Sequence, residues 1–406
     1  MIIEMFPAEN GDSFLIGLDN GKNIVIDMGY ATTYRNFIKD RFIDLNNKNQ
    51  CIDLLIITHI DEDHIEGAIE FFEENGASEK PRIIEVKEIW YNSYRHLQFQ
   101  KNKVSGISRF EKRKLEEIKL SNSEKSRDEN NEFSNVSARQ GSTLAGYLYE
   151  YGYSSLKWNK SFNHETVNLD FLDEIILGDV KFHILSPDSK KLSKLSKLWL
   201  GQLIKMDKDF NISDEVIFDD AYEMYIKNSK PLVDVEEERN VSYSSKDFED
   251  IITKKIHQGK KDSTESNGSS ISFILEYKDK KLLFLSDSHE DIILDNIKKY
   301  SKSEEVIEFD VIKISHHGSL KNNFKWIEKL HSNQYIISTN GRSHGHPHKE
   351  VLAKILQNNT KQKKFYFNYP IGLKEEFEQE KLKEIYNYSV EFGDGESILK
   401  IEVNNK

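Results

Sequence analysis

The sequence has a single cysteine, no long apolar run and no visible secretory signal. Cys51 has no second cysteine with which to form an intrachain disulfide, and one cysteine cannot build a cysteine-based metal site. No apolar run approaches the roughly 18 residues that cross a bilayer. The N-terminus lacks a basic region ahead of a hydrophobic core. We therefore expect a cytoplasmic protein with no membrane partner.

The length and the net charge restrict the kinds of function that are expected. The 406 residues carry a formal net charge of −12, which argues against indiscriminate coating of nucleic acid but leaves room for a local basic channel. Residues 91–130 contain ten Lys and Arg against six Asp and Glu, whereas residues 211–250 contain twelve acids against four bases. Each segment is typical of a solvated helix face. The basic segment is also where a phosphate backbone can lie.

The densest group of metal-binding residue types follows the apolar run 54–57. His59, Asp61, Asp63 and His64 come directly after it. Neutral imidazoles and carboxylates are the usual ligands of divalent first-row metals. The simpler alternative is a solvated acidic loop that happens to contain two histidines, but such a density directly after a buried strand favours a metal site.

Apolar patterning around this motif predicts a layered arrangement of strands and helices. The Asn20–Gly21 pair between two apolar runs is a strong hairpin signal. A helix after the motif should bury Ile65, Ala68, Ile69 and Phe72. Strands are expected at 12–16, 23–27, 53–58, 175–186, 271–277 and 281–285, and a further helix near 34–45.

Three later strands end in similar residue types. They lead to Asp287 and His289, to His316 and His317, and to His344, His346 and His348. In layered α/β folds such strand ends converge at one edge of a sheet. Each cluster alone has a simpler interpretation. His289 is expected to be a surface residue that opens a helix. The pair 316–317 can be one core and one exposed histidine, and 345–348 can be a turn.

Two segments interrupt the strand pattern. Residues 91–164 are polar and helical with a basic start, and 121–137 has the composition of a mobile loop. Residues 188–264 are acidic and helical, and they lead into the Lys-, Ser- and Gly-rich stretch 259–268. Although length alone suggests two or three domains, we predict one domain over 1–406 that carries these two insertions.

The order of these motifs resembles the metallo-β-lactamase fold superfamily, whose hallmark is H-x-H-x-D-H after an early strand. Here Asp61 stands where the second His is usual, a variant similar to the hydrolase domain of ComEC-type DNA-uptake proteins and their soluble relatives. The resemblance covers 1–85 and about 265–355, and it implies an α/β fold of the αββα sandwich type. The other matching motifs are Asn10-Gly11-Asp12-Ser13, Ile26-Asp27-Met28-Gly29, Ser286-Asp287, 310–319 and Gly345-His346-Pro347.

The resemblance also implies two divalent metal ions, manganese or zinc. His59, Asp61 and a further imidazole would hold one ion, and Asp63, His64 and His346 the other, with Asp287 as the bridge. The family's third motif is normally a His where Asn267-Gly268-Ser269-Ser270 stands here. Either His316 or His317 can fill that gap or act on the substrate instead, and His348 is a rival to His346.

These residue types favour hydrolysis of a phosphodiester. Several carboxylates make a harder site than the His-rich relatives have, which favours manganese over zinc. Two cations lower the pKa of a shared water and clamp the attacking and leaving oxygens. Asp63 is the candidate for orienting the hydroxide. Lys313, His316 and His317 are candidates for meeting phosphate oxygens or protonating the leaving group.

The predicted function is therefore a nuclease or related phosphodiesterase, with nucleic acid as the substrate and 91–130 helping to hold it. One alternative is a metallo-hydrolase of a small ester, lactone or nucleotide, whose insertions cap a closed pocket; the superfamily hosts both. A groove lined by Lys101, Lys112 and Arg113 would favour the polymer. A third is a degenerate site used for binding or assembly. By analogy alone, partner proteins of a defence-type system, such as phage defence, are also expected.

Overall fold

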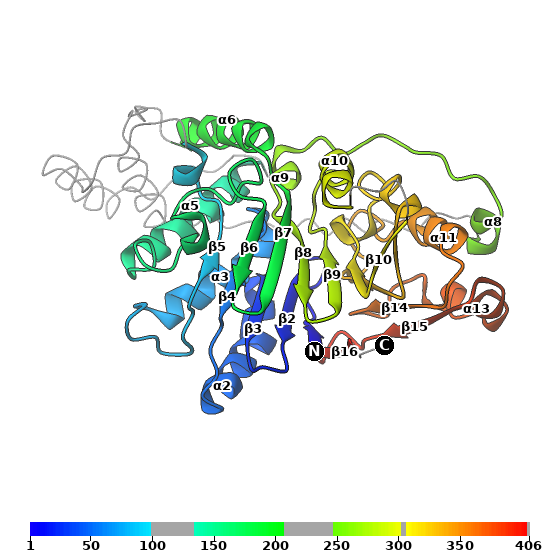
Figure 1. The fold of residues 1–406 in the computed structure, drawn as a ribbon, viewed down its shortest axis with the longest axis horizontal. Helices are drawn as coiled ribbons and strands as arrows, with labels where there is room; N and C mark the ends of the chain where they lie inside the picture. Colours follow the sequence, from blue (N-terminus) through cyan, green and yellow to red (C-terminus); the bar gives the residue numbers. More distant parts are fainter. Residues whose placement is uncertain (99–133, 207–246, 302–305, 404–406) are drawn as a thin grey trace, which may run out of the picture. The chain divides into compact units, whose positions relative to one another are not determined.

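The structure is a computed structural model that describes residues 1–98, 134–206, 247–301 and 306–403. Its strands form a six-stranded sheet in the order β16-β1-β2-β3-β4-β5 and an eight-stranded sheet in the order β15-β14-β13-β11-β9-β8-β7-β6 (Figure 1). The first sheet contains β1 (Ile2–Met5), β2 (Ser13–Gly17), β3 (Asn23–Met28), β4 (Leu54–Ile56), β5 (Ile89–Trp90) and β16 (Leu399–Glu402). The second contains β6 (Glu174–Leu177), β7 (Val180–Ser186), β8 (Ser272–Tyr277), β9 (Lys280–Phe284), β11 (Val311–Lys313), β13 (Gln334–Ile337), β14 (Lys363–Phe367) and β15 (Tyr388–Phe392).

Both sheets are mixed. In the larger sheet, β6 to β9 pair antiparallel, whereas β9, β11, β13, β14 and β15 run parallel. Parallel neighbours need crossover connections, and these are supplied mainly by helices. A separate parallel pair joins β10 (Ile307–Phe309) to β12 (Leu330–Ser332).

Helical segments flank these strands. They are α1 (Ala31–Thr33), the π-helical η1 (Tyr34–Ile38), α2 (Lys39–Asn47), α3 (Glu62–Asn75), η2 (Tyr94–Gln98), α5 (Ser134–Glu150), η3 (Lys160–Phe162), α6 (Ser189–Met206), α8 (Phe248–Ile252), α9 (Glu265–Gly268), α10 (Glu290–Ser301), η4 (His316–Gly318), η5 (Trp326–Glu328), α11 (Lys349–Asn358), α12 (Lys374–Phe377) and α13 (Glu380–Tyr386).

The chain divides into two compact units. Unit 1 comprises the described residues of Met1–Ile26, Asn168–Lys191 and Glu238–Lys406, and unit 2 those of Asp27–Val167 and Leu192–Glu237. The prediction of one domain over 1–406 stays a prediction.

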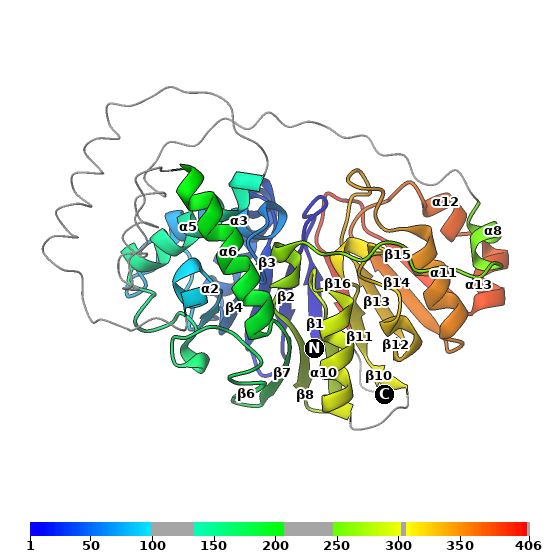
Figure 2. The ribbon, with the colours of Figure 1, turned by 90° about the horizontal axis from the view of Figure 1, so that it is seen from above.

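In unit 1 the two faces of the eight-stranded sheet have different neighbours. On one face, side chains from neighbouring strands, such as Leu283 of β9, Ile312 of β11 and Ile337 of β13, share one apolar core with Ile293 of α10 and Leu352 of α11. The separation of the two faces follows from the two-residue period of a strand, which sends successive side chains to opposite faces. The helices α8, α11, α12 and α13 gather near β14 and β15 (Figure 2).

The opposite face of this sheet packs against the other sheet within unit 1. Phe284 of β9 contacts Phe14 of β2 edge to face, with ring centroids 5.7 Å apart, and stacks on Phe273 of β8 at the same separation. Aromatic pairs in these arrangements add to the stabilisation from burial alone. Unit 1 therefore has a helix layer on a sheet and a second sheet beneath it.

Unit 2 is organised around α3. The Gly67 amide donates to the Gly29 carbonyl at 2.9 Å, and a Cβ on Gly67 would lie 2.1 Å from the Met28 carbonyl oxygen. The helix therefore approaches the end of β3 at a distance that only glycine allows. Phe71 and Phe72 on the buried face of α3 pack against aromatic neighbours that include Tyr34, Phe42 and Tyr153.

The structure confirms the predicted α/β class, with two sheets and flanking helices. The 20–21 hairpin turn is present, since Leu18 and Lys22 are joined by a backbone hydrogen bond of 2.9 Å. Ile65, Ala68 and Phe72 are buried as predicted, whereas Ile69 is only partly buried. The predicted loop over 121–137 is wrong for residues 134–137, which begin α5; the rest of it lies outside the described residues.

The two predicted insertions are described only in part. Helical segments within them are η2, α5, η3, α6 and α8, while 99–133 and 207–246 lie outside the described residues, including Lys101, Lys112 and Arg113. Within the described ranges, each helix is too short or too polar to cross a membrane.

Candidate metal centre

In unit 2 the predicted ligand cluster spans the turn between β4 and α3 and the first turn of α3. The strand ends at Ile56, and Asp61 adopts an extended conformation as the residue before the helix, with φ −73° and ψ 145°. His59 and His64 are buried, whereas the side chains of Asp61 and Asp63 are 31% and 18% exposed. The positive end of the helix dipole favours carboxylates at this place.

Each of these histidines has a carboxylate beside its outer nitrogen. His59 Nε2 lies 3.6 Å from Asp61 Oδ2, and His64 Nε2 lies 3.8 Å from Asp63 Oδ1. The two imidazole rings are 4.1 Å apart between centroids. Two ligand atoms that each lie about 2 Å from one ion are separated by slightly less than these distances. The spacing therefore suits cation binding better than a direct hydrogen bond.

Asp27, at the end of β3, fixes the orientation of this cluster. Its carboxylate accepts hydrogen bonds from His64 Nδ1 at 2.8 Å, from Thr58 Oγ1 at 2.7 Å and from the Thr58 amide at 2.8 Å. The side chain is fully buried, and the backbone has a positive φ of 53°. A buried carboxylate that receives the Nδ1 proton leaves the Nε2 lone pair of His64 for a metal.

Thr58 determines which ring nitrogen of His59 carries the hydrogen. Its hydroxyl gives its one hydrogen to Asp27, so its 3.0 Å contact with His59 Nδ1 places the hydrogen on the ring. His59 Nε2 is then an acceptor; it is buried and has no hydrogen-bond partner among the described residues. Such an atom costs free energy unless something binds it. The donor set therefore fits a divalent cation.

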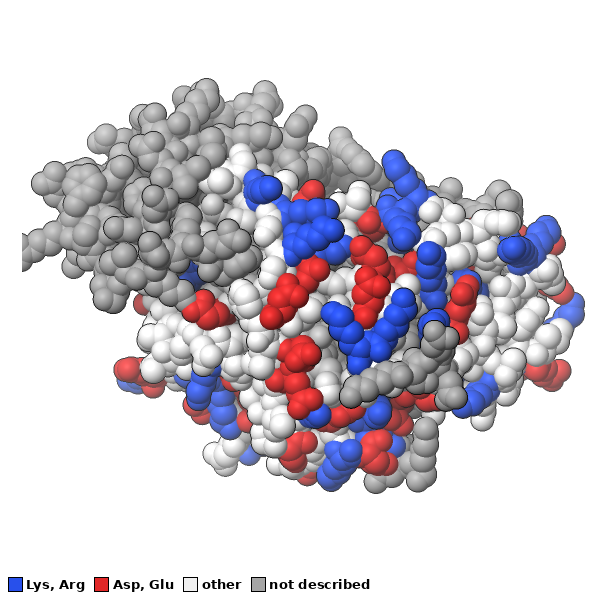
Figure 3. Space-filling view, turned by 45° about the horizontal axis from the view of Figure 1, so that its top comes forward, with Lys and Arg blue, Asp and Glu red and all other residues white. Residues whose placement is uncertain are grey.

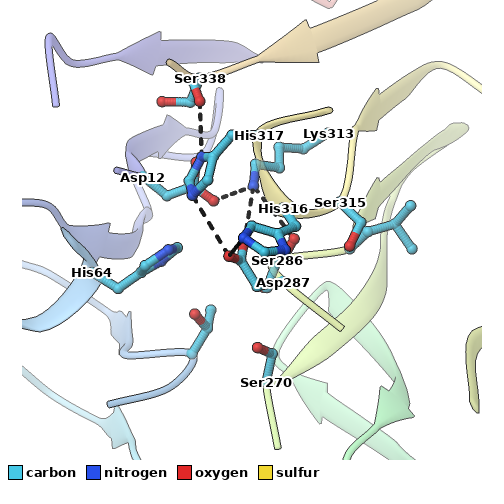
Figure 4. A network of polar contacts seen from close by, with 12 residues as sticks. Asp12, His64, Ser270, Ser286, Asp287, Lys313, Ser315, His316, His317 and Ser338 are labelled. Carbon is cyan, nitrogen blue, oxygen red and sulfur yellow. Dashed lines mark hydrogen bonds and ion pairs between the residues drawn. The ribbon is translucent and has the colours of Figure 1, made fainter. Parts of the chain in front are cut away.

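Unit 1 carries a second group of predicted residues, centred on Asp287 (Figure 4). Asp287 follows β9, and its Oδ2 lies 3.6 Å from His317 Nε2 and 3.7 Å from His316 Nε2. The two histidines follow β11 at the start of η4. All three come from ends of parallel strands, where α/β proteins place their sites.

Lys313 lies at the base of this group. It is fully buried, and its Nζ makes an ion pair with Asp12 and lies 3.9 Å from Asp287 Oδ1. It also donates to the Ser286 carbonyl at 3.5 Å. A buried ammonium beside two buried carboxylates lowers the electrostatic cost of keeping both charged.

His317 is oriented by the main chain. Its Nδ1 donates to the Ser338 carbonyl at 2.9 Å and lies 3.5 Å from Asp12 Oδ1. Since a carbonyl only accepts, the hydrogen is on Nδ1 and the Nε2 lone pair faces Asp287. His316 and His317 both have positive φ, 44° and 51°. Left-handed conformations at two successive non-glycine residues are strained and concentrate at functional sites.

His346 lies beside these imidazoles. Its ring centroid is 5.1 Å from that of His316 and 5.0 Å from that of His348. Burial and the neighbouring histidines hold the pKa of His346 well below its usual value. His348 Nδ1 accepts the Leu320 amide at 3.1 Å, so one of its nitrogens is committed to the main chain.

The structure thus places the predicted site residues in two groups, each within its own unit. His59, Asp61, Asp63 and His64 form the unit 2 group; Asp287, Lys313, His316, His317 and His346 form the unit 1 group. Asn267, where the third-motif His is usual, lies with its Nδ2 3.3 Å from His316 Nδ1. The expectation of a surface position for His289 is wrong: it precedes α10, but it is 9% exposed and contacts Lys191.

Sequence reasoning assigned no role to Asp12, Asp27 or Asp262. The first two lie in matched motifs, each at an end of a predicted strand, which was the available signal. Asp262 lies in a stretch whose composition resembles a linker. Its place beside His316 depends on packing that a single sequence does not reveal.

Residues 7–130 match the family model of the Metallo-beta-lactamase superfamily. The matched span includes Asp12, Asp27 and the cluster from His59 to His64. A search of the curated proteins found no match. The family match and the buried His and Asp groups together support a metal-dependent hydrolase.

Proposed function

We propose that this protein is a metal-dependent phosphodiesterase that cleaves nucleic acid. The observation that carries the proposal is the pair of histidines after β4, His59 and His64, whose Nε2 atoms lie beside Asp61 and Asp63. Asp61 stands where the superfamily usually has a His, and this resemblance to ComEC-type hydrolase domains also supports the proposal.

The resemblance implies a ligand assignment for two ions. His59, Asp61 and His316 or His317 would hold one; Asp63, His64 and His346 would hold the other; Asp287 would bridge them. Bound divalent cations supply Lewis acidity and an activated water at neutral pH. The share of carboxylates favours manganese over zinc. Nothing in this assignment requires a cysteine or an added cofactor.

The remaining residues have roles that follow from their contacts. Asp27 and Thr58 hold the proton on Nδ1 of His64 and His59, and so keep Nε2 as the ligand atom. Lys313 balances the charge of Asp12 and Asp287. Asp63 would orient the attacking water. An imidazole from 316–317 that is not a ligand, or Lys313, would meet the phosphate oxygens or the leaving group.

A hydrolase of a small ester, lactone or nucleotide is the second candidate, and the surface charge favours it. On the face in Figure 3, Lys and Arg of the described residues are interspersed with Asp and Glu. A nucleic-acid groove usually has a field of positive charge. The basic segment 91–130, which would supply that field, lies mostly outside the described residues.

The test is cleavage of single-stranded, double-stranded and supercoiled DNA, RNA and cyclic dinucleotides by the manganese-loaded protein, beside a small phosphodiester and a lactone. Asp61→Ala should abolish cleavage. Asp53→Ala is the matched control, because the Asp53 carboxylate pairs with Lys87 at 2.8 Å and lies just before β4, not in the His59–His64 motif. If the wild type hydrolyses a small substrate and none of the nucleic acids, the nuclease proposal is wrong.

A further inference from the structure

Asp262 is a nearly buried carboxylate with an unusually complete set of donors. Its side chain is 5% exposed. It accepts the Thr264 amide at 3.0 Å and the Thr264 hydroxyl at 2.9 Å on Oδ1, and the amide groups of Asn267 at 2.8 Å and Asn322 at 3.0 Å on Oδ2. Burial opposes its ionisation, but hydrogen bonds from His316, Thr264, Asn267 and Asn322 outweigh that and hold its pKa far below the usual range.

This carboxylate faces the inner nitrogen of His316. His316 Nδ1 lies 3.5 Å from Asp262 Oδ2 and 3.1 Å from Asn322 Oδ1. The Asn322 amide is fixed, since its Nδ2 donates to Asp262 Oδ2 and to the carbonyls of Asp287 and Ser288, each at 3.2 Å. Its oxygen must then point at His316. This oxygen is closer to Nδ1 than Asn267 Nδ2, which lies 3.3 Å away and donates to Asp262 at 2.8 Å, so the contacts favour a hydrogen on Nδ1.

A second imidazole approaches Asp262 from the other side. The Lys191 ammonium donates to His289 Nδ1 at 2.8 Å, so the neutral ring carries its hydrogen on Nε2, which lies 3.8 Å from Asp262 Oδ1. A Cβ on Gly268 would lie 2.8 Å from His289 Cε1, so the glycine leaves the space that this ring occupies. Asp262 therefore lies between two imidazoles, with one ring nitrogen of each within 3.8 Å of its carboxylate.

We propose that Asp262 is a positioning residue: with Asn322 it holds the His316 hydrogen on Nδ1, so that the Nε2 lone pair is directed toward Asp287. Asp262 thereby orients His316 in unit 1, as Asp27 orients His64 in unit 2. The orientation of the ring stands on the contacts in unit 1 alone. Only its consequence, stronger binding of a metal by Nε2, rests on the proposed function.

The first test needs no variant of Asp262. Histidine side chains labelled with ¹⁵N report the tautomer through their long-range couplings to ring hydrogens, and a His316→Gln sample assigns the His316 signals. The measurement uses the metal-free full chain at a pH where His316 is neutral. We expect the Nδ1–H tautomer. Finding the Nε2–H tautomer overturns the proposal.

The second test compares Asp262→Asn with Asp291→Asn. The first variant keeps an acceptor oxygen but offers an amide that can donate to Nδ1, so the Nε2–H population of His316 should rise. Asp291 pairs with Lys191 at 3.0 Å at the exposed outer end of the same network, and its loss should leave the His316 signals unchanged. Equal spectra for both variants and the wild type overturn the proposal.

Calorimetric titration with Mn²⁺ separates this inference from the proposed function. Loss of such an orienting partner typically weakens metal binding by about tenfold to a hundredfold, and we expect that loss for Asp262→Asn and none for Asp291→Asn. If the tautomer results hold but the wild type binds neither Mn²⁺ nor Zn²⁺, the positioning role stands and the proposed function fails. If the wild type binds Mn²⁺ and Asp262→Asn binds equally well, the proposed function stands and the contribution of Asp262 to metal binding is wrong.

Discussion

The two groups of site residues differ in how the chain builds them. In unit 2 the ligand candidates come from one short segment that joins β4 to the first turn of α3. Side chains orient them: Asp27 holds His64, and Thr58 holds His59. In unit 1 they come from the ends of separate strands, and His317 is oriented by a main-chain carbonyl. The unit 2 group is contiguous in sequence and can be recognised there. The unit 1 group is assembled by folding from distant segments and depends on the fold.

The largest effect is expected at the assembled group. Asp287→Asn keeps the shape of the side chain but removes the charge that lies beside His316, His317 and Lys313. Loss of a metal ligand, the role proposed for Asp287, costs several kcal/mol of transition-state stabilisation, so kcat/KM should fall by about a thousandfold. The measurement is steady-state hydrolysis of the substrate that the cleavage test above identifies. Activity within tenfold of the wild type would remove Asp287 from the site.

A smaller loss is expected when only the orientation of a ligand changes. Asp27→Asn should weaken Mn²⁺ binding by about tenfold to a hundredfold, because the His64 hydrogen is no longer held on Nδ1 by a carboxylate. Calorimetry with Asp53→Asn as the control in the same unit measures this. Unchanged affinity in Asp27→Asn would show that the contiguous group does not depend on its buried carboxylate.

Gly318→Ala tests whether the assembled group depends on close packing of its loops. Gly318 has φ +91°, and a Cβ there would lie 2.4 Å from Pro347 Cβ, next to His346. The added methyl should push the loop at 316–318 away from the loop at 346–347 and cost about 1–3 kcal/mol of unfolding free energy. Urea denaturation measures the change. An unchanged midpoint would mean that the loops separate without cost.

The smallest effect on the site is expected from Ser338→Ala. Ser338 orients His317 through its carbonyl, which alanine retains, while its hydroxyl donates to the Gly11 carbonyl at 2.6 Å. The hydroxyl also accepts the Asn368 amide at 3.1 Å. Metal affinity should therefore stay close to that of the wild type, and stability should fall by about 1–3 kcal/mol for the two lost hydrogen bonds. A loss of affinity as large as that of Asp27→Asn would show that the hydroxyl, and not the carbonyl, positions the imidazole.

The sequence was sufficient for the contiguous group and for the fold class. Short apolar runs followed by Asp or His predicted β4, β9, β11 and β13, and the His59–His64 motif pointed to metal chemistry. Contacts between residues that are distant in sequence could not be predicted. No local pattern shows that Asp27 accepts from His64, that Lys313 pairs with Asp12, or that Asp262 lies beside His316, because each contact is created by folding.

The central claim is that the two groups bind divalent metal ions, and metal titration of the metal-free protein tests it most directly. We expect two Mn²⁺ ions per chain for the wild type, with binding weakened by His59→Ala in unit 2 and also by Asp287→Ala in unit 1. The Asp53→Ala protein should bind as the wild type does. Failure of the wild type to bind Mn²⁺ or Zn²⁺, or wild-type binding by the Asp287→Ala protein, would contradict the account.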